Sequence, residues 1–595
     1  MTTAAAGDAW GKALRETRRL LARYVPSEAQ RVFGLTILIG LLCGFAAVAF
    51  HLSIRFAERE LIDRAMSAGP GSWIAWTLVT PTLGGLAAGL LLLIVPRAAG
   101  SGVPQVKEAY AAGGGRIRLR DSIGKFVIGV VQIGSGASLG REGPTVQICA
   151  GVTSLLGRLT SLPKESVRRL LPVGVAAGIA AAFNAPIAAV TFTIEEIVGN
   201  LDQTVLSGVV VAAALAAVIE RSVLGTQPVF EVSRAYGLEH ASSLFFYAGL
   251  GLAAAAVSVT FTDSLLALRA WFKRFHGLPR WSHPALGGLV TGGLAVLALF
   301  FLKSKGVTGG GYDTLSKALL GQIGLRVLLA LGAMKLIATV ACYSSGGAGG
   351  IFAPALFIGG MLGGAVGFVD LSLMGQGDSE LGAFALVGMG AAFAGIIRAP
   401  ITSVLIIFEM TGGYGLILPL MIANMTAYGL ARHWRPVPIY EALLEQDGVM
   451  IPRVGSSATG TLDKVPVADA MTRDPVRVLS GATLAEAQAF TATARFSSVP
   501  VVDESSRFLG MLSLAELREA SDGGQGVRPA RELIRSTECV ASDDPLLSAV
   551  VAMSRAGVRQ LGVVAADDSG RLVGILAMSD VFRAQARAAE GPGHA

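Results

Sequence analysis

The sequence predicts an all-α, multi-pass membrane protein that continues into a cytoplasmic α/β tail, and three observations support this fold class. The 595 residues are 52% hydrophobic and only 15% charged, with 76 glycines, whereas soluble proteins have about 25% charged residues. The charge is also unevenly spread: residues 461–595 hold 31 charged residues in 135 (23%), and residues 1–460 hold 60 in 460 (13%). Finally, each part contains an internal repeat.

The basic excess lies on the membrane part, where residues 1–460 carry a net charge of +10 against −3 for the tail. Lys and Arg in loops set the orientation of membrane proteins, so this excess does not indicate a nucleic-acid partner. No nucleophile–base pair, metal cluster or phosphate-binding loop emerges, so an enzyme is not predicted. Four scattered cysteines argue against a disulfide framework or a zinc site: Cys43, Cys149, Cys342 and Cys539.

Residues 1–32 contain five arginines but no apolar core of a signal peptide. This stretch predicts a cytoplasmic N-terminal helix at the membrane surface. With the tail on the same side, we expect an integral protein of a bacterial inner membrane with both termini in the cytoplasm.

Apolar runs in the membrane part are interrupted by glycine, proline or charge. A span needs about 20 apolar residues, yet residues 134–144 read GSGASLGREGP and residues 345–354 read SGGAGGIFAP. Unpaired backbone cannot face lipid, so these breaks must lie within the protein or line an aqueous cavity. Helices that stop in mid-membrane predict an ion or substrate site.

The membrane part, taken as residues 33–446, repeats itself in two halves, about 33–223 and 241–431. APIAAVTFTIE (185–195) matches APITSVLIIFE (399–409) at an offset of 214, and Gly140 and Pro144 match Gly350 and Pro354 at an offset of 210. The halves are inverted if each crosses the membrane an odd number of times. Glu195 aligns with Glu409, and we expect both to satisfy nearby backbone groups.

The tail also repeats, after a linker over residues 447–466. Residues 467–520 and 528–586 each alternate short strands with helices and contain a hairpin signal. The first hairpin joins 499–502 to 508–512, and the second joins 562–565 to 571–576. Pro500 cannot donate to a β-ladder, so we expect it at a strand start or on an edge.

Three segments of the membrane part can bind an anion. Ser101, in GSGVP (100–104), precedes a helical pattern over 105–112, and free amides at a helix start favour anions. A simple turn and N-cap is the alternative. The segment GIFAP (350–354) supplies amides without a carboxylate; taken alone it would be a flexible hinge.

The third segment, GREGP (140–144), places Glu142 before a helix predicted to start at Pro144. A carboxylate that competes there with a mobile anion forms a gate, although an Arg141–Glu142 pair or a capping acid is the alternative. Ionisable groups inside a membrane are costly and usually functional. Glu196 ends an apolar run where a proton can enter, but a helix-end acid can equally be solvated surface.

With Glu196, these motifs resemble the CLC family of chloride channels and chloride/proton antiporters, over essentially all of residues 30–446. The resemblance implies two inverted halves, a homodimer with one pathway per subunit, an external gating glutamate at Glu142 and an internal proton-transfer glutamate at Glu196. It implies that Ser101 and Tyr440 coordinate chloride. The assisting backbone groups would be those of Gly140, Arg141, Gly143, Ile351 and Phe352.

Two activities of this fold stay open. Antiporters of the family generally carry an acid at the position of Glu196, which favours chloride/proton exchange over the alternative, a passive channel. A serine at position 101 resembles chloride-preferring members, whereas nitrate-preferring relatives tend to have proline there. A nucleotide sensor with a membrane anchor would need only one or two spans, so we reject it as the main function.

The tail resembles a pair of CBS motifs, which bind adenine nucleotides in other chains. The usual ribose-contacting pattern is Ser or Thr followed three residues later by Asp. Here Ser513 is followed by Glu516, and Asp580 follows Ala577, so both copies depart from the pattern. A packing module that stabilises the dimer is the alternative, and no other cofactor or metal is expected.

Overall fold

The computed structural model describes residues 28–69, 71–111, 114–160, 164–199, 203–225, 242–374, 381–412 and 414–449, and in the tail 462–463, 465–491, 498–513, 529–567 and 570–589. It also describes positions 162, 236–238, 240 and 517. Most of the predicted N-terminal surface helix lies outside these residues. Residues 28–32 begin the first long helix, α2, and are continuous with it.

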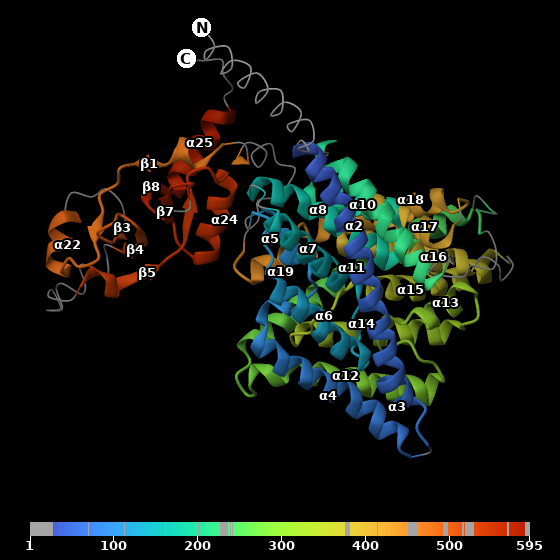
Figure 1. Cartoon of the computed structure of the whole chain (residues 1–595). Helices are drawn as coiled ribbons and strands as arrows, with labels where there is room; N and C mark the ends of the chain where they lie inside the picture. Colours follow the sequence, from blue (N-terminus) through green and yellow to red (C-terminus); the bar gives the residue numbers. More distant parts are fainter. Residues whose placement is uncertain are drawn as a thin grey trace, which may run out of the picture.

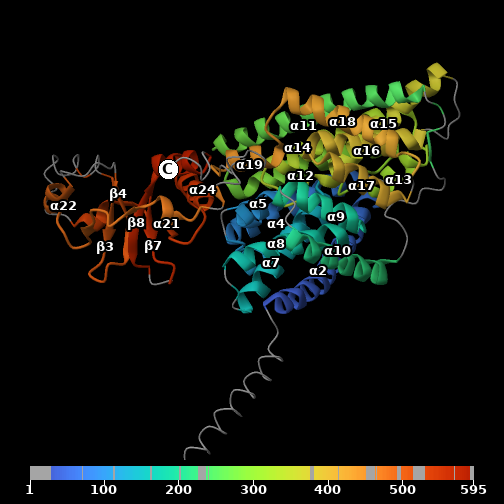
Figure 2. The same cartoon turned by 90° about the horizontal axis from the view of Figure 1, so that it is seen from above.

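The chain forms a helical part and a smaller strand-containing part beside it (Figures 1 and 2). The helices of the first half are α2 (Glu28–Glu58), α3 (Arg64–Met66), α4 (Trp73–Ile94), α5 (Val103–Ala111), α6 (Leu119–Gly134), α7 (Glu142–Leu159), α8 (Lys164–Phe183), α9 (Pro186–Phe192), the π-helical turn η3 (Thr193–Val198) and α10 (Gln203–Leu224).

The second half contains α11 (Ser243–Arg274), α12 (His283–Leu297), α13 (Tyr312–Leu319), α14 (Leu325–Ser344), α15 (Phe352–Met374), α16 (Leu381–Ile397), α17 (Pro400–Thr411), α18 (Ile417–Trp434) and α19 (Ile439–Gln446). Within the described residues, eight helical stretches are long and apolar enough to cross a membrane. The protein is therefore a multi-pass membrane protein.

Both predicted interruptions are confirmed. The helix α6 ends at Gly134 before α7 begins, and α14 ends at Ser344 before α15 begins. The helix start predicted at Pro144 is wrong by two residues, because α7 begins at Glu142. Proline fits anywhere in the first turn of a helix, because the amides there have no acceptor within the helix. Pro144 is accordingly the third residue of α7 and not its first.

Two of the membrane-capable helices, α8 and α15, lie deepest inside the helical part. The share of the most apolar 18-residue window that is buried is 89% in α8 and 78% in α15, against 33–44% in the other spanning stretches. Glycine allows α15 and α16 to pack closely: a Cβ on Gly359 would lie 2.3 Å from the carbonyl of Gly388, and one on Gly388 2.3 Å from that of Gly359.

The two halves exchange helix caps. Both carboxylate oxygens of Glu409 accept from the start of α9, at Ile187 (3.0 Å) and Ala188 (2.7 Å). Glu195 in turn accepts from the start of α17, at the amides of Ile401 (3.1 Å) and Thr402 (2.8 Å). The structural role expected for these two glutamates is confirmed, and the reciprocity relates the two segments by a local two-fold axis.

The tail has two four-stranded sheets, in the orders β1-β8-β7-β6 and β2-β3-β4-β5. Each sheet contains one strand from the other repeat. The strand β1, from the first repeat, pairs with β8 of the second repeat, and β5, from the second repeat, pairs with β4 of the first. The elements are α21 (Val467–Ala470), β1 (Thr472–Arg473), β2 (Val478–Leu479), α22 (Leu484–Thr491), β3 (Ser498–Val502), β4 (Phe508–Ser513), β5 (Ile534–Ser536), β6 (Cys539–Ala541), α24 (Leu546–Ala556), β7 (Gln560–Val564), β8 (Leu572–Ala577) and α25 (Met578–Ala589).

Both predicted hairpins are confirmed as the antiparallel pairs β3–β4 and β7–β8. Pro500 lies in the middle of β3 rather than at its start. The short strand β2 pairs only with Val501 and Val502, so Pro500 has a strand neighbour on the β4 side alone. At Pro500, β3 is therefore locally an edge strand on the β2 side, where no backbone amide is needed for pairing.

Candidate ion-binding site

The three glycine-rich segments lie against one another. A Cβ atom on Gly143 would lie 2.4 Å from the carbonyl oxygen of Ser101, and one on Gly350 would lie 3.0 Å from the amide nitrogen of Gly143. A side chain at either glycine would force these backbones apart. The starts of α5, α7 and α15 therefore meet inside the helical part, which is the arrangement expected from the sequence.

The start of α15 offers amides that have no acceptor within the helix. Its first helical hydrogen bond runs from the amide of Ala355 to the carbonyl of Ile351, which leaves the amide of Phe352 outside the helical ladder. The predicted ligand Gly140 differs, because its amide and that of Gly350 donate to each other's carbonyls at 2.7 Å. The amide of Gly140 is thus already used in joining the two halves.

Glu142 is the first residue of α7 and is fully buried. Its Oε1 accepts a hydrogen bond from the hydroxyl of Tyr312, and its Oε2 has no partner among the described residues. The guanidinium of Arg141 lies over the ring of Tyr312, 5.4 Å from its centroid, instead of pairing with Glu142. The carboxylate therefore occupies the positive end of α7, where it would compete with an anion.

Two hydroxyl groups at this place face each other. Ser101 Oγ and the Tyr440 hydroxyl are fully buried and lie close together, and neither makes a hydrogen bond to another described residue. Ser101 lies just before α5, and Tyr440 lies within α19; these two helices pack together. The ring centroid of Tyr440 is 6.3 Å from that of Phe352. Buried polar atoms are nearly always hydrogen-bonded, so these two hydroxyls fit a ligand that accepts hydrogen bonds.

Two buried lysines hold matching loops in the two halves. Lys125 donates to the carbonyl of Gly100 at 2.7 Å and so fixes the loop that carries Ser101. Lys335, 210 residues later, donates to the carbonyls of Gly306 (3.1 Å) and Gly309 (2.5 Å). The loop before α13 is thus the structural counterpart of the Ser101 loop.

Glu196 is buried in η3 and pairs with Lys107 of α5, with 2.7 Å between Nζ and Oε1. The same ammonium pairs with Glu441 of α19 at 2.5 Å. The alternative of a solvated helix-end acid does not hold for Glu196, because only 6% of its side chain is exposed.

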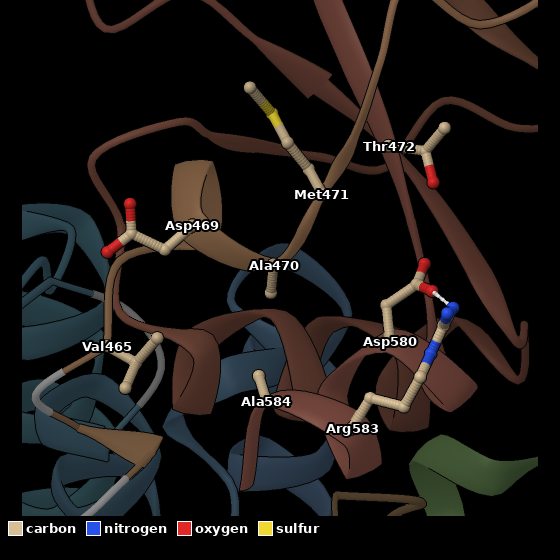
Figure 3. Close-up of a pocket in the computed structure, with 8 residues that line it drawn as sticks. All are labelled: Val465, Asp469, Ala470, Met471, Thr472, Asp580, Arg583 and Ala584. Atoms are coloured by element: carbon tan, nitrogen blue, oxygen red, sulfur yellow. Dashed lines mark hydrogen bonds and ion pairs between the residues drawn. The ribbon is translucent and has the colours of Figure 1, made fainter. Parts of the chain in front are cut away.

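In the tail, Asp580 lines a cavity of about 490 Å³ together with residues of α21, β1 and α25 (Figure 3). One oxygen of Asp580 accepts from the amide of Ala577 at 2.9 Å, and the other pairs with Arg583. Both oxygens are thus used within the chain. Ser513 ends β4, and Glu516 lies outside the described residues.

Comparison with known proteins follows the same division of the chain. The model of the voltage gated chloride channel family matches residues 83–432, and the model of the CBS domain matches residues 467–523 and 530–587. The chain belongs to the voltage-gated chloride channel, or CLC, family.

Among curated CLC relatives, the H(+)/Cl(-) exchange transporter ClcA of Salmonella paratyphi A is 31% identical over 437 residues, which cover 72% of this chain and 91% of that protein. ClcA of Vibrio cholerae serotype O1 is 33% identical over 422 residues, or 70% and 89% of the two chains. These relatives are transporters and not enzymes, in agreement with the sequence prediction.

Among solved CLC structures, a slow cyanobacterial Cl⁻/H⁺ antiporter matches with a TM-score of 0.64 at 28% identity, covering 70% of this chain and 97% of that one. A eukaryotic CLC transporter matches with a TM-score of 0.61 at 19% identity, covering 92% and 98%. The latter shows that the fold of the helical part and the CBS tail is shared across nearly the whole chain.

Four residues that contact the candidate site were not predicted from the sequence: Lys107, Lys125, Tyr312 and Glu441. Lys125 could have been found from the repeat, since the offset of 210 that links Gly140 to Gly350 also links Lys125 to Lys335. Tyr312 could not, because the same offset places it opposite Gly102. Lys107 and Glu441 have no such signal. Their pairing depends on how α5 and α19 meet, and nothing in either local sequence predicts it.

Proposed function

We propose that this CLC protein is a secondary active antiporter that exchanges chloride for protons across the membrane. The observation that carries the proposal is the pair of buried hydroxyls, Ser101 and Tyr440, beside the starts of α7 and α15. Neither hydroxyl has another hydrogen-bond partner among the described residues. Two hydroxyl donors and the positive ends of two helices suit a dehydrated halide. The exchange activity named for the ClcA relatives supports the same assignment.

Chloride would be held by Ser101 and Tyr440 together with backbone groups at the helix starts. The amides of Ile351 and Phe352 and those next to Glu142, in Arg141 and Gly143, would assist. The amide of Gly140 is engaged by Gly350, so we leave it out of the ligand set.

Glu142 would act as the gate. Its carboxylate and chloride compete for the positive end of α7, and protonation would weaken its hold there and let it carry the proton. Glu196 would pass protons to and from the opposite side. A coupled exchange follows when neither ion can complete its passage without Glu142 moving.

The CBS tail would regulate transport through the helices that carry the chloride ligands. The helix α24 packs against α5, with 3.5 Å between Arg555 and Glu108. In Figures 1 and 2, α24 is the helix of the tail nearest to α5 and α19. We further propose a homodimer in a bacterial plasma membrane with both termini in the cytoplasm, as the resemblance to the family implies.

The test is reconstitution of the full-length protein into liposomes, with chloride and proton fluxes recorded together. Antiport predicts that an outward chloride gradient drives protons into the vesicles against their own gradient. Chloride flux that follows the membrane potential without any change in pH would favour the alternative, a passive chloride channel.

A further inference from the structure

Three charged side chains from distant parts of the sequence form one buried cluster. The ammonium of Lys107 on α5 lies 2.7 Å from Glu196 on η3 and 2.5 Å from Glu441 on α19. With all three groups ionised the cluster carries a net charge of −1, and uptake of one proton brings it to zero. Since an uncompensated buried charge is costly, the cluster is built to accept a proton.

Exposure falls along the cluster. The side chain of Glu441 is 21% exposed, that of Lys107 is 10% exposed and that of Glu196 is 6% exposed. The side chain of Glu441 is thus the most solvent-exposed of the three and that of Glu196 the least. Oε2 of Glu441 is itself buried, so the exposed part of this side chain lies elsewhere, and Oε2 has no partner among the described residues that would keep it from taking up a proton.

The other charged groups nearby are already engaged. Glu195, next to Glu196, accepts from the amides at the start of α17. Glu108, next to Lys107, pairs with Arg555 of the CBS tail. Glu441 is thus the acid of this region that has both a water-facing side and direct contact with the Glu196–Lys107 pair.

We propose that Glu441 receives protons from the side of the membrane on which the CBS tail lies, and that Lys107 relays them to Glu196. The inference rests on the antiport proposed above and names the residues that supply its protons. In each transfer, Lys107 gives one ammonium proton to the Glu196 carboxylate and takes one from the protonated Glu441. Lys107 ends as an ammonium, Glu196 ends neutral and Glu441 ends as a carboxylate, so one proton has moved and no charge has been lost.

The relay can be separated from a purely structural ion pair by two substitutions. Glu441→Gln keeps the size of the side chain but cannot release a proton. Lys107→Arg keeps a cation for both carboxylates, but a guanidinium does not give up its proton in proteins. In liposomes we expect each variant to lower proton flux by about tenfold or more, in line with the loss of a positioned acid–base group, while chloride flux continues.

Glu445→Gln is the matched control, because Glu445 lies one helical turn further along α19 and is exposed. It should leave both fluxes unchanged, and Glu441→Asp should restore part of the proton flux. Coupled transport by Lys107→Arg at the wild-type ratio, or an equal loss of both fluxes in Glu441→Gln, would overturn the relay. Absence of proton transport in the unmodified protein would instead overturn the antiport proposal itself.

Discussion

The hydroxyl of Tyr312 donates a hydrogen bond to the carboxylate of Glu142, and so joins the first residue of α13 to the first residue of α7. The loop before Tyr312 is the repeat counterpart of the loop that carries Ser101, because Lys335 and Lys125 hold the two loops in the same way. One copy thus places a hydroxyl at the proposed chloride site, and the other copy places a hydroxyl on the carboxylate of the proposed gate.

Removing this hydroxyl should free the gate. A hydrogen bond to a charged group contributes about 1.5–3 kcal/mol, which corresponds to a change on the order of 10- to 100-fold in how long the carboxylate stays in place. We expect Tyr312→Phe to raise chloride turnover in liposomes and to leave the chloride-to-proton ratio unchanged, because Glu142 itself remains. Tyr414→Phe is the control, since Tyr414 is 74% exposed. Unchanged turnover in Tyr312→Phe would show that the bond does not restrain the gate.

Neutralising the gate should uncouple the two ions. In Glu142→Gln the side chain keeps its size and can still accept from Tyr312, but it cannot carry a proton. Chloride flux should persist, and proton flux should fall to the background of empty liposomes. Proton uptake driven by a chloride gradient in this variant would contradict the role of Glu142.

Much of the site could be predicted from the sequence because its chemistry sits in short motifs. The breaks around Glu142 and Phe352 follow from glycine and proline in otherwise apolar runs, and the caps at Glu195 and Glu409 follow from the repeat. The availability of an amide could not be predicted: Gly140 and Gly350 have equally suitable local sequences, and only their crossing shows that their amides bond to each other.

Contacts between elements far apart in the chain could not be predicted from the sequence either. Lys107 and Glu441 are 334 residues apart, and their pairing depends on the packing of α19 against α5. In the tail, the exchange of β1 and β5 between the two sheets has no local signature, because a strand of two or three residues carries too little side-chain pattern to specify its partner.

The hydroxyl at position 101 should set anion preference. Ser101→Pro removes the side-chain hydroxyl, so chloride loses a hydrogen-bond donor. It also removes the amide proton, which in the unmodified protein donates to the hydroxyl of Tyr343 at 3.3 Å. We expect the affinity ratio of chloride to nitrate, measured by calorimetry on purified protein, to fall by roughly tenfold, the value of about one hydrogen bond to an ion. Ser101→Ala is the second variant; it removes only the hydroxyl, and we expect a smaller shift in the same direction. An unchanged ratio in both variants would exclude Ser101 as a determinant of selectivity.

The adjacent acids Glu195 and Glu196 should behave in opposite ways. Glu195 caps α17 and Glu409 caps α9 in return, so Glu195→Ala and Glu409→Ala should each destabilise the protein by about 0.5–2 kcal/mol, the cost of a lost helix cap. Both should lower the melting temperature in detergent while the chloride-to-proton ratio stays normal.

Glu196→Gln should keep the melting temperature closer to that of the unmodified protein, because an amide oxygen can still accept from Lys107, yet it should lose proton flux and retain chloride flux. The two measurements together separate the roles, since a cap changes stability without changing coupling and a proton-transfer group does the reverse. Loss of coupling in Glu195→Ala, or normal coupling in Glu196→Gln, would show that the proton passes through the other carboxylate of the pair.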